Sequence, residues 1–520
     1  MTIGPEPLAI ERGGRRTSPL VKNIIYNLVG QGTVLLLSFL AIRFIFRRLG
    51  GDAFGIIYFN ALLTSVLLTV LEFGVSSTTV REVARSSSTE PLYVRDLIRT
   101  ASLFYWASFV VFAILIYLGA PVLVEHWIHL ATMPPSTAIL GLRVLGIAAL
   151  VALPRLLYSS LCRGLQRMEF NNAIDVGAAI LTQGGMVVIL LLHSNFQTVV
   201  YWIAVVAVLT VVSYMAVTAR LFSPLALVPG YSALVVRRNL GFGLHMVAIS
   251  TLSLVFTQGT QVMLSALLNI TEFGFYGFLY NLAARAAFVP GAIAQAAQPA
   301  LNKLASLGEE VAFQAQFRKL QDLVSFGTAP IFALIPFGGL PFLSYLFSPS
   351  AAGSLLLPAT LLSLGFYMSA MLAVPFLVSL AVGRPQIATQ ANLIALIVVL
   401  PISAVLVVRF GLAGAAFSWV FYFIFAYAYQ IPRYSRECLH IPVREWYARL
   451  LRVTIAIGVS YGVAWSILSL VHMWSLLALA LAYIAASLVY LAGAWLLIGA
   501  ELRGTALAQL GGLRSWRTRP

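Results

Sequence analysis

Apolar residues occur along this chain in blocks of about twenty, separated by short segments that carry most of the charges. About twenty consecutive apolar residues are needed to cross a hydrocarbon core as an α-helix, whereas membrane barrels use short alternating segments. The pattern therefore predicts an all-α integral membrane protein with about fourteen transmembrane helices. The predicted spans are 24–46, 54–75, 101–118, 138–158, 174–192, 199–217, 240–268, 273–301, 323–347, 355–382, 387–408, 413–429, 453–471 and 474–498.

Composition and charge agree with a membrane protein and indicate its orientation. Of the 520 residues, 60% are hydrophobic and 10% are charged, which excludes a soluble domain with a polar surface. The net charge of +16 would suggest nucleic acid in a soluble protein, but most of the 33 basic residues lie in alternate loops. Basic loops stay in the cytoplasm, so both ends are expected there, and no cleavable signal peptide is expected in residues 1–20.

An internal repeat is visible at one offset. Phe54–Gly55 match Phe273–Gly274, 219 residues later, and Gly164 matches Gly383 at the same offset. Matches at equivalent places in the topology predict two six-helix halves in parallel orientation, followed by an appended pair of helices. The expected organisation is a cytoplasmic N-tail (1–20), an amino-terminal lobe (21–235), a carboxy-terminal lobe (236–432), the appended pair (433–500) and a cytoplasmic C-tail (501–520).

Charged side chains inside the predicted spans are few, and most are arginines. A charge at the bilayer centre costs roughly 3 to 10 kcal/mol, so such residues generally face a water-filled cavity or a partner. Guanidinium groups make bidentate, charge-assisted hydrogen bonds to phosphate oxygens. The arginines therefore predict a cavity that binds an anion; the alternative is that some of them snorkel to an interface or pair internally. The candidate anion-binding residues are Arg285, Arg143, Arg43 and Arg155.

Further polar residues in the spans have less specific interpretations. Glu72 lies near the inner end of its span and is expected to pair with Arg81 or Arg85, or to take part in ion coupling. Asp175 is a second candidate for ion coupling or an ion pair. The uncharged candidates for a cavity lining are Asn60, Gln258, Gln261 and Gln295.

The span 273–301 combines Arg285 with two internal prolines, Pro290 and Pro299. Proline inside a helix frees carbonyl groups and allows bending, so this span is predicted to be deformable and to line a cavity. Its alanines and glycines would also favour close packing against a neighbouring helix, and the two interpretations are compatible.

Several activities lack the residues that they need. No glycine-rich segment ends in Gly-Lys, so no P-loop is present. Cys162 and Cys438 lie far apart and have no metal-binding spacing. The predicted outer loops are short, and the longest, 119–135, is largely apolar. We therefore expect a protein that is not an enzyme and that uses neither a cofactor nor a metal.

Three sequence segments carry a resemblance to a known family. They are RRLGGDAFG after the first span, LEFGVSSTTVREVAR at the end of the second and CRGLQRMEFNNA after the fourth, together with the central arginine of the eighth. In this order they resemble the polysaccharide-exporter branch of the multidrug/oligosaccharidyl-lipid/polysaccharide (MOP) superfamily, which contains O-antigen (Wzx-type) flippases and has the lipid II flippases as relatives. The resemblance covers residues 20–500.

The resemblance implies two six-helix lobes that form a MATE-like V around a central cavity. Alternating access would then move a polyprenyl-pyrophosphate-linked oligosaccharide, an O-antigen or exopolysaccharide repeat unit, across the bacterial inner membrane. Membrane lipid is an expected partner and a polysaccharide polymerase or ligase a further candidate, whereas nucleic acid is not expected. Arginines of the first and eighth spans contribute to cationic cavities in such families, which implies this role for Arg43 and Arg285.

Two alternatives remain open at this point. A MATE-type drug or cation antiporter shares the fold, but its cavity should be acidic or aromatic, whereas embedded arginines outnumber embedded carboxylates here. A membrane glycosyltransferase or polymerase would need a large outer loop or an acidic catalytic motif, and neither is visible. Which glycan would be moved does not follow from the sequence.

Overall fold

The computed structural model describes residues 19–504 apart from 73, 88, 193–194 and 473–474, and it leaves out the side chains of 19–32, 240, 242–253 and 255–257. The predicted tails 1–20 and 501–520 lie almost entirely outside the described residues. Each predicted span falls on one helix or on two or three consecutive helical elements. The helices are α1 Pro19–Leu49, α2 Gly51–Leu71, α3 Val75–Ser86, α4 Pro91–His126, α5 Pro135–Leu150, α6 Ala152–Gly164, α7 Met168–Leu192, α8 Phe196–Leu221, η1 Pro224–Leu227, α9 Ala233–Leu267, α10 Ile270–Ala286, α11 Phe288–Leu307, α12 Glu310–Leu346, α13 Pro349–Ala381, α14 Gln386–Arg433, η2 Tyr434–Leu439, α15 Val443–Ile457, η3 Gly458–Gly462, α16 Val463–Val471 and α17 Leu476–Leu497.

Within the described chain, ten helical segments are long and apolar enough to cross a membrane. One of them, Gln386–Leu439, holds two predicted spans, 387–408 and 413–429. Between them Gly411 has a φ of 54°, a left-handed conformation that glycine adopts readily. A Cβ atom on Gly414 would overlap the carbonyl oxygen of Leu406, eight residues earlier. Residues eight apart are about 12 Å apart in a straight helix, so α14 is a hairpin with two arms.

Two predicted spans are interrupted by proline. The predicted helix 138–158 is divided at Val151, three residues before Pro154, and the predicted helix 273–301 is divided at Ala287, three residues before Pro290. Proline has no N–H to donate to the carbonyl four residues earlier, and its ring clashes with that carbonyl. Each interruption therefore lies where a proline removes a helical hydrogen bond, although α12 and α13 continue through their internal prolines.

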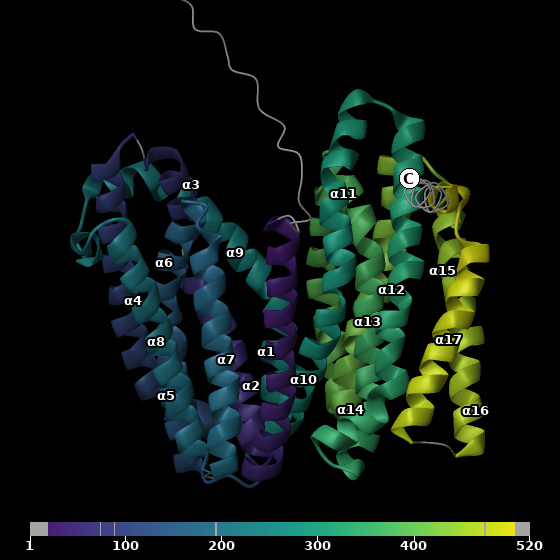
Figure 1. The fold of residues 1–520 in the computed structure, drawn as a ribbon, viewed down its shortest axis with the longest axis horizontal. Coiled ribbons are helices and arrows are strands. Elements are labelled where there is room, and N and C mark those ends of the chain that lie inside the picture. Colours follow the sequence, from purple (N-terminus) through teal and green to yellow (C-terminus); the bar gives the residue numbers. More distant parts are fainter. Residues whose placement is uncertain (1–18, 73, 88, 193–194, 473–474, 505–520) are drawn as a thin grey trace, which may run out of the picture.

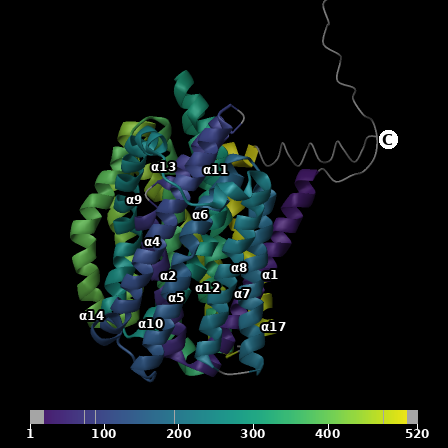
Figure 2. The ribbon, with the colours of Figure 1, turned by 90° about the vertical axis from the view of Figure 1, so that its left-hand side faces the viewer.

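The helices form two groups with a central set between them (Figure 1). Helices α3 to α8 make one group and α11 to α17 the other, while α1, α2, α9 and α10 lie between the two. The appended helices α15, α16 and α17 cover the far edge of the second group, where α15 and α17 pack on α12. The side view shows that α14 and α9 lie near one edge of the molecule and α1 and α17 towards the opposite edge (Figure 2).

The two repeat-related turns contact each other directly. Helix α2 packs against α10, and a Cβ atom on Gly274 would come within 2.8 Å of the Gly55 Cα atom. The Thr271 hydroxyl donates a hydrogen bond of 2.9 Å to Asp52, a residue 219 positions earlier. Contacts between equivalent residues are characteristic of a pair related by two-fold symmetry. The halves therefore meet as a symmetric pair would, and their residue boundaries stay a prediction.

The second sequence match, Gly164 with Gly383, was aligned wrongly by two residues. In the later turn the left-handed residue is Gly383, with a φ of 76°, but in the earlier turn it is Gln166, with a φ of 59°. The closing hydrogen bonds agree, because the N–H of Arg167 donates to Cys162 and that of Arg384 to Ser379. These pairs are 217 residues apart, so the offset changes from 219 to 217 between the two turns.

Candidate functional site

Arg43 lies near the carboxy-terminal end of α1 and binds the end of another helix. Its guanidinium donates a 3.0 Å hydrogen bond to the carbonyl of Tyr345 and stacks 3.8 Å from the centre of that ring. Arg47 donates to the carbonyls of Ser344, Tyr345 and Phe347. The last carbonyls of a helix have no partner within it and carry partial negative charge, so two cations stabilise the end of α12. In this structure Arg43 therefore joins α1 to α12.

Arg143 is engaged elsewhere, in the first group of helices. Its side chain donates a 2.9 Å hydrogen bond to the carbonyl of Tyr117 on α4 and lies 4.1 Å from the centre of that ring. Arg155 instead contacts Asp175 on α7. The interruption at Val151 therefore does not bring the two arginines of this predicted span to one place.

Arg155 and Asp175 form an ion pair with an N–O distance of 2.7 Å. The Tyr214 hydroxyl donates a further hydrogen bond of 2.9 Å to the same carboxylate oxygen. These groups lie at a cavity of about 300 Å³ between α5, α6, α7 and α8, which we call the ion-pair pocket. The two predicted site residues neutralise each other here.

Glu72 lies near a different arginine from those expected. The positive charge that acts on it is Arg163, whose guanidinium also donates a 2.9 Å hydrogen bond to Ser76. Arg81 instead forms an ion pair of 2.9 Å with the buried Glu82. The turn between α2 and α3 brings Glu72 towards the end of α6, a contact that the sequence order does not reveal.

Arg285 differs from the other candidate arginines. It lies in the last turn of α10, directly before the interruption at Ala287, and its side chain is exposed. It makes no hydrogen bond or ion pair with any residue whose side chain the structure describes, and the nearby group that it affects electrostatically is Tyr58 on α2. Helix α10, which carries Arg285 in its last turn, lies between the two groups of helices (Figure 1).

The uncharged candidates lie mainly on the central helices. Gln258 on α9 donates a 2.9 Å hydrogen bond to Ser65 on α2. Gln261 on the same helix lies beside the hydroxyl of Tyr280 on α10. The side-chain oxygen of Asn60 is buried on α2 with no hydrogen-bond partner in the described chain, and Gln295 is exposed on α11.

Two contiguous apolar cavities approach Arg285 and were not predicted. The larger, of about 900 Å³, lies between α1, α12 and α17, and the smaller, of about 280 Å³, extends to Leu279 and Leu282 on α10. They share Phe39, Leu334, Gly338 and Phe342. Leu282 is one helical turn before Arg285. Adjacent apolar cavities therefore line the space from the appended helix α17 to Leu282 of α10.

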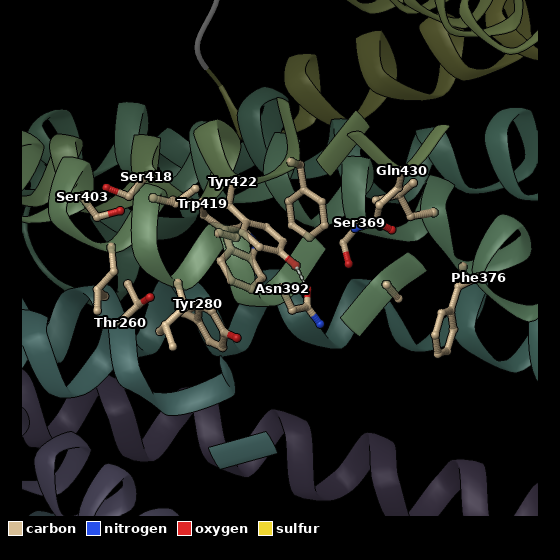
Figure 3. A pocket seen from close by; sticks show the side chains of 18 residues that line it. Thr260, Tyr280, Ser369, Phe376, Asn392, Ser403, Ser418, Trp419, Tyr422 and Gln430 are labelled. Atoms are coloured by element: carbon tan, nitrogen blue, oxygen red, sulfur yellow. Dashed lines mark hydrogen bonds between the residues drawn. The ribbon is translucent and has the colours of Figure 1, made fainter. Parts of the chain in front are cut away.

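A further cavity, of about 440 Å³, lies where the central helices α9 and α10 meet α13 and α14 of the second group, and we call it the aromatic pocket (Figure 3). Trp419 and Tyr422 from the second arm of α14 gather at its middle with Tyr280 and Asn392, and Tyr422 donates its hydroxyl hydrogen to Asn392. None of its lining residues is charged. They are Thr260, Tyr280, Ser369, Leu372, Ala373, Phe376, Ala388, Asn392, Ala395, Leu396, Val399, Leu400, Ser403, Ser418, Trp419, Tyr422, Phe423 and Gln430.

The sequence and the fold are both similar to those of known proteins. Residues 20–305 match the family described as "Polysaccharide biosynthesis protein". A protein of Shigella flexneri that is named as an O-antigen transporter is 22% identical over 406 residues, covering 77% of this chain and 94% of that one.

Two solved structures share the fold. The lipid II flippase MurJ in an inward closed conformation has a TM-score of 0.66 and 12% identity, covering 91% of this chain and 98% of that one. An inward-facing multidrug MATE transporter of the MOP superfamily has a TM-score of 0.58 and 12% identity, covering 79% and 98%. At these identities the likeness establishes an all-helical membrane fold of the MurJ and MATE type.

Proposed function

The chain belongs to the polysaccharide biosynthesis protein family, and on that premise we propose that it is a flippase for a polyprenyl-pyrophosphate-linked oligosaccharide. It acts by alternating access in the bacterial inner membrane, with about fourteen spans arranged as six, six and two and with both termini in the cytoplasm. The named function of the Shigella relative supports a polysaccharide cargo. The cargo has an anionic pyrophosphate, a polar glycan and a long apolar tail, and each part needs its own environment.

The observation that carries the proposal is the unpartnered cation Arg285. A pyrophosphate cannot cross hydrocarbon unaided, because an isolated charge in an apolar medium is strongly unfavourable. An exposed guanidinium at the boundary between the two groups of helices offers that charge a bidentate partner. Arg43, Arg143 and Arg155 have partners in this structure, so a contact of theirs with the cargo would require those bonds to break.

The apolar cavities suit the rest of the lipid. They run between α1, α12 and α17 to Leu282, one turn from Arg285. A polyprenyl chain placed there stays in apolar surroundings while its pyrophosphate lies at the arginine. The head and the tail of one molecule can thus be held at the same time.

The test is transport in proteoliposomes of a fluorescent polyprenyl pyrophosphate that carries a neutral trisaccharide. Dithionite destroys the fluorophores in the outer leaflet, so the rate of loss reports movement between leaflets. We expect Arg285→Ala to slow this movement roughly 10- to 100-fold, because a hydrogen-bonded charge pair contributes about 1.5–3 kcal/mol. Arg285→Lys keeps the charge without the bidentate geometry, so its transport rate should lie between those of the wild type and Arg285→Ala.

The matched control is Arg409→Ala, since Arg409 is an exposed arginine beside the turn of α14. Equal rates for the wild type, Arg285→Ala and Arg409→Ala would remove Arg285 from the mechanism. In cells, deletion of the gene should make lipid-linked repeat units accumulate in the cytoplasmic leaflet. Unchanged glycan with altered drug tolerance would instead indicate the antiporter.

A further inference from the structure

We propose that the aromatic pocket binds uncharged sugar residues of the cargo and thereby selects its glycan. This inference rests on the proposed flippase function and adds to it a second binding site, separate from the cation that holds the pyrophosphate. The pocket lies between α9, α10, α13 and the two arms of α14. Its volume of about 440 Å³ falls within the range of small-ligand sites, about 300–1,000 Å³.

Aromatic rings form the walls of the pocket. The rings of Trp419 and Tyr422 are nearly parallel, 17° apart, with their centres separated by 5.8 Å. Tyr280 approaches Trp419 at 5.5 Å and at a steep angle of 66°. A pyranose ring presents a face of C–H groups, which packs on the electron-rich face of an aromatic ring. The walls therefore match the apolar faces of a sugar.

Polar groups between these rings lack partners. The indole N–H of Trp419 is buried and makes no hydrogen bond to a described residue. Asn392 accepts a hydrogen bond from Tyr422 through its amide oxygen, which leaves its NH₂ group without a partner in the described chain. A buried donor without a partner is costly and is normally satisfied by a ligand or water. A sugar hydroxyl in the pocket can accept a hydrogen bond from the Asn392 amide, whereas the enclosed indole N–H could donate to a ligand only after the ring moves.

The absence of charge in the lining distinguishes a sugar from the other candidate ligands. A phosphate would require a cation, and none lines the pocket. A cationic drug would be attracted by the aromatic faces, but the lining offers it no carboxylate. An uncharged ligand with hydroxyl groups and apolar faces satisfies both the rings and the Asn392 amide.

The position of the pocket allows one cargo molecule to reach both sites. Tyr280 contributes to the pocket and lies five residues before Arg285 on α10. Five residues correspond to about 7.5 Å along a helix and about 140° around it, so the glycan must pass around α10 to reach the pocket from Arg285. A pyrophosphate at Arg285 is followed directly by the first sugars of the glycan. The first sugar lies beside the pyrophosphate, so the pocket binds a sugar farther along the glycan.

The experiment compares two probes in proteoliposomes: fluorescent polyprenyl pyrophosphates that carry one or three neutral hexoses. We expect the wild type to move the trisaccharide probe faster, and Trp419→Ala to lower this rate about tenfold, the effect of 1.4 kcal/mol, while the monosaccharide probe changes less than about twofold. Asn392→Leu should act in the same direction. Trp419→Phe, which keeps a ring but loses the N–H, should lie between Trp419→Ala and the wild type.

The control is Trp495→Ala, since Trp495 is a tryptophan on α17 that is 38% exposed and does not line the pocket. If Trp419→Ala does not insert into the membrane, Asn392→Leu and Trp419→Phe decide the question. If these variants keep the wild-type ratio of trisaccharide to monosaccharide transport rates, the proposed sugar pocket is wrong, but the proposed flippase function stands. Competition by an aromatic cation such as rhodamine 6G, without competition by free trisaccharide, would also overturn it. A wild type that moves neither probe would remove the flippase and the pocket together.

Discussion

The ion-pair pocket and the aromatic pocket are counterparts in the two halves of the chain, yet their chemistry is opposite. At the offset of 217 that the turns define, lining residues of one pocket coincide with lining residues of the other. The coincident pairs are Ala152 with Ser369, Arg155 with Leu372, Asp175 with Asn392, Ala178 with Ala395, Ala179 with Leu396 and Thr182 with Val399. The salt bridge of the first pocket is thus replaced by a leucine and an amide in the second.

Helix α8 lines the ion-pair pocket and the second arm of α14 lines the aromatic pocket, and these two walls also differ in chemistry. At an offset of 216, Ile203, Val206 and Ala207 of α8 correspond to Trp419, Tyr422 and Phe423 in the second arm of α14. Aliphatic walls surround an ion pair in one half, and aromatic walls surround an amide in the other. A tyrosine donates to the polar residue in both, Tyr214 to Asp175 and Tyr422 to Asn392. One pocket neutralises its own charges, whereas in the other the Asn392 NH₂ group has no hydrogen-bond partner among the described residues, which agrees with the proposed binding of a ligand in the second half.

Transfer of the charged pair of the ion-pair pocket into the aromatic pocket gives the largest expected effect. Leu372→Arg with Asn392→Asp builds the salt bridge of the first pocket into the second. The new side chains should bond to each other and occupy the space between the rings, so movement of the trisaccharide probe should fall about 100-fold, the effect of about 2.8 kcal/mol. The proteoliposome rate, corrected for the amount of inserted protein, measures this. Transport at the wild-type rate would mean that the chemistry of this pocket is irrelevant to the cargo.

A smaller effect is expected from a position where the two halves differ by one methyl group. Gly365 corresponds to Ala148 at the offset of 217, and a Cβ atom on Gly365 would lie 2.5 Å from Cδ1 of Trp419. Gly365→Ala should displace the indole and slow the trisaccharide probe about fivefold, the effect of about 1 kcal/mol. Ala148→Gly makes the reverse change in the other half and serves as the control. Equal losses in both variants would indicate a general effect on packing.

The contrast also shows which features a sequence reveals. The helical membrane fold and a deformable span around Pro290 were predictable, because each depends on residues close together in the chain, but the prolines of α12 and α13 do not interrupt those helices. Arg285 was recognisable because a charge within an apolar block is rare. Trp419 and Asn392 gave no such signal, since uncharged residues in an apolar run also suit a packed interior, and they come together only because α14 reverses at Gly411.

For the arginines, the charged side chains were recognisable from the sequence, but their partners were not. Arg43 and Arg155 were visible as embedded charges, but each has its partner on another helix. Arg43 binds the carbonyl of Tyr345, 302 residues later, and Arg155 binds Asp175 on the next helix. A charge in a span establishes that a partner or a cavity is needed, whereas the tertiary packing decides which of the two is present.

The smallest expected effect concerns the stability of the ion-pair pocket. Arg155→Leu introduces the leucine found at the corresponding position 372 but leaves Asp175 without its cation. The double variant Arg155→Leu with Asp175→Asn reproduces the neutral pair Leu372 and Asn392 of the second half. The side chains of Arg155 and Asp175 are 40% and 44% exposed, so the pair is expected to contribute about 1 kcal/mol or less. The single variant should therefore melt slightly below the wild type in detergent, by no more than about 2 °C, and the double variant should recover most of that loss. A double variant less stable than the single one would show that the first pocket needs its charges for more than mutual neutralisation, and the two pockets would then differ in function as well as in chemistry.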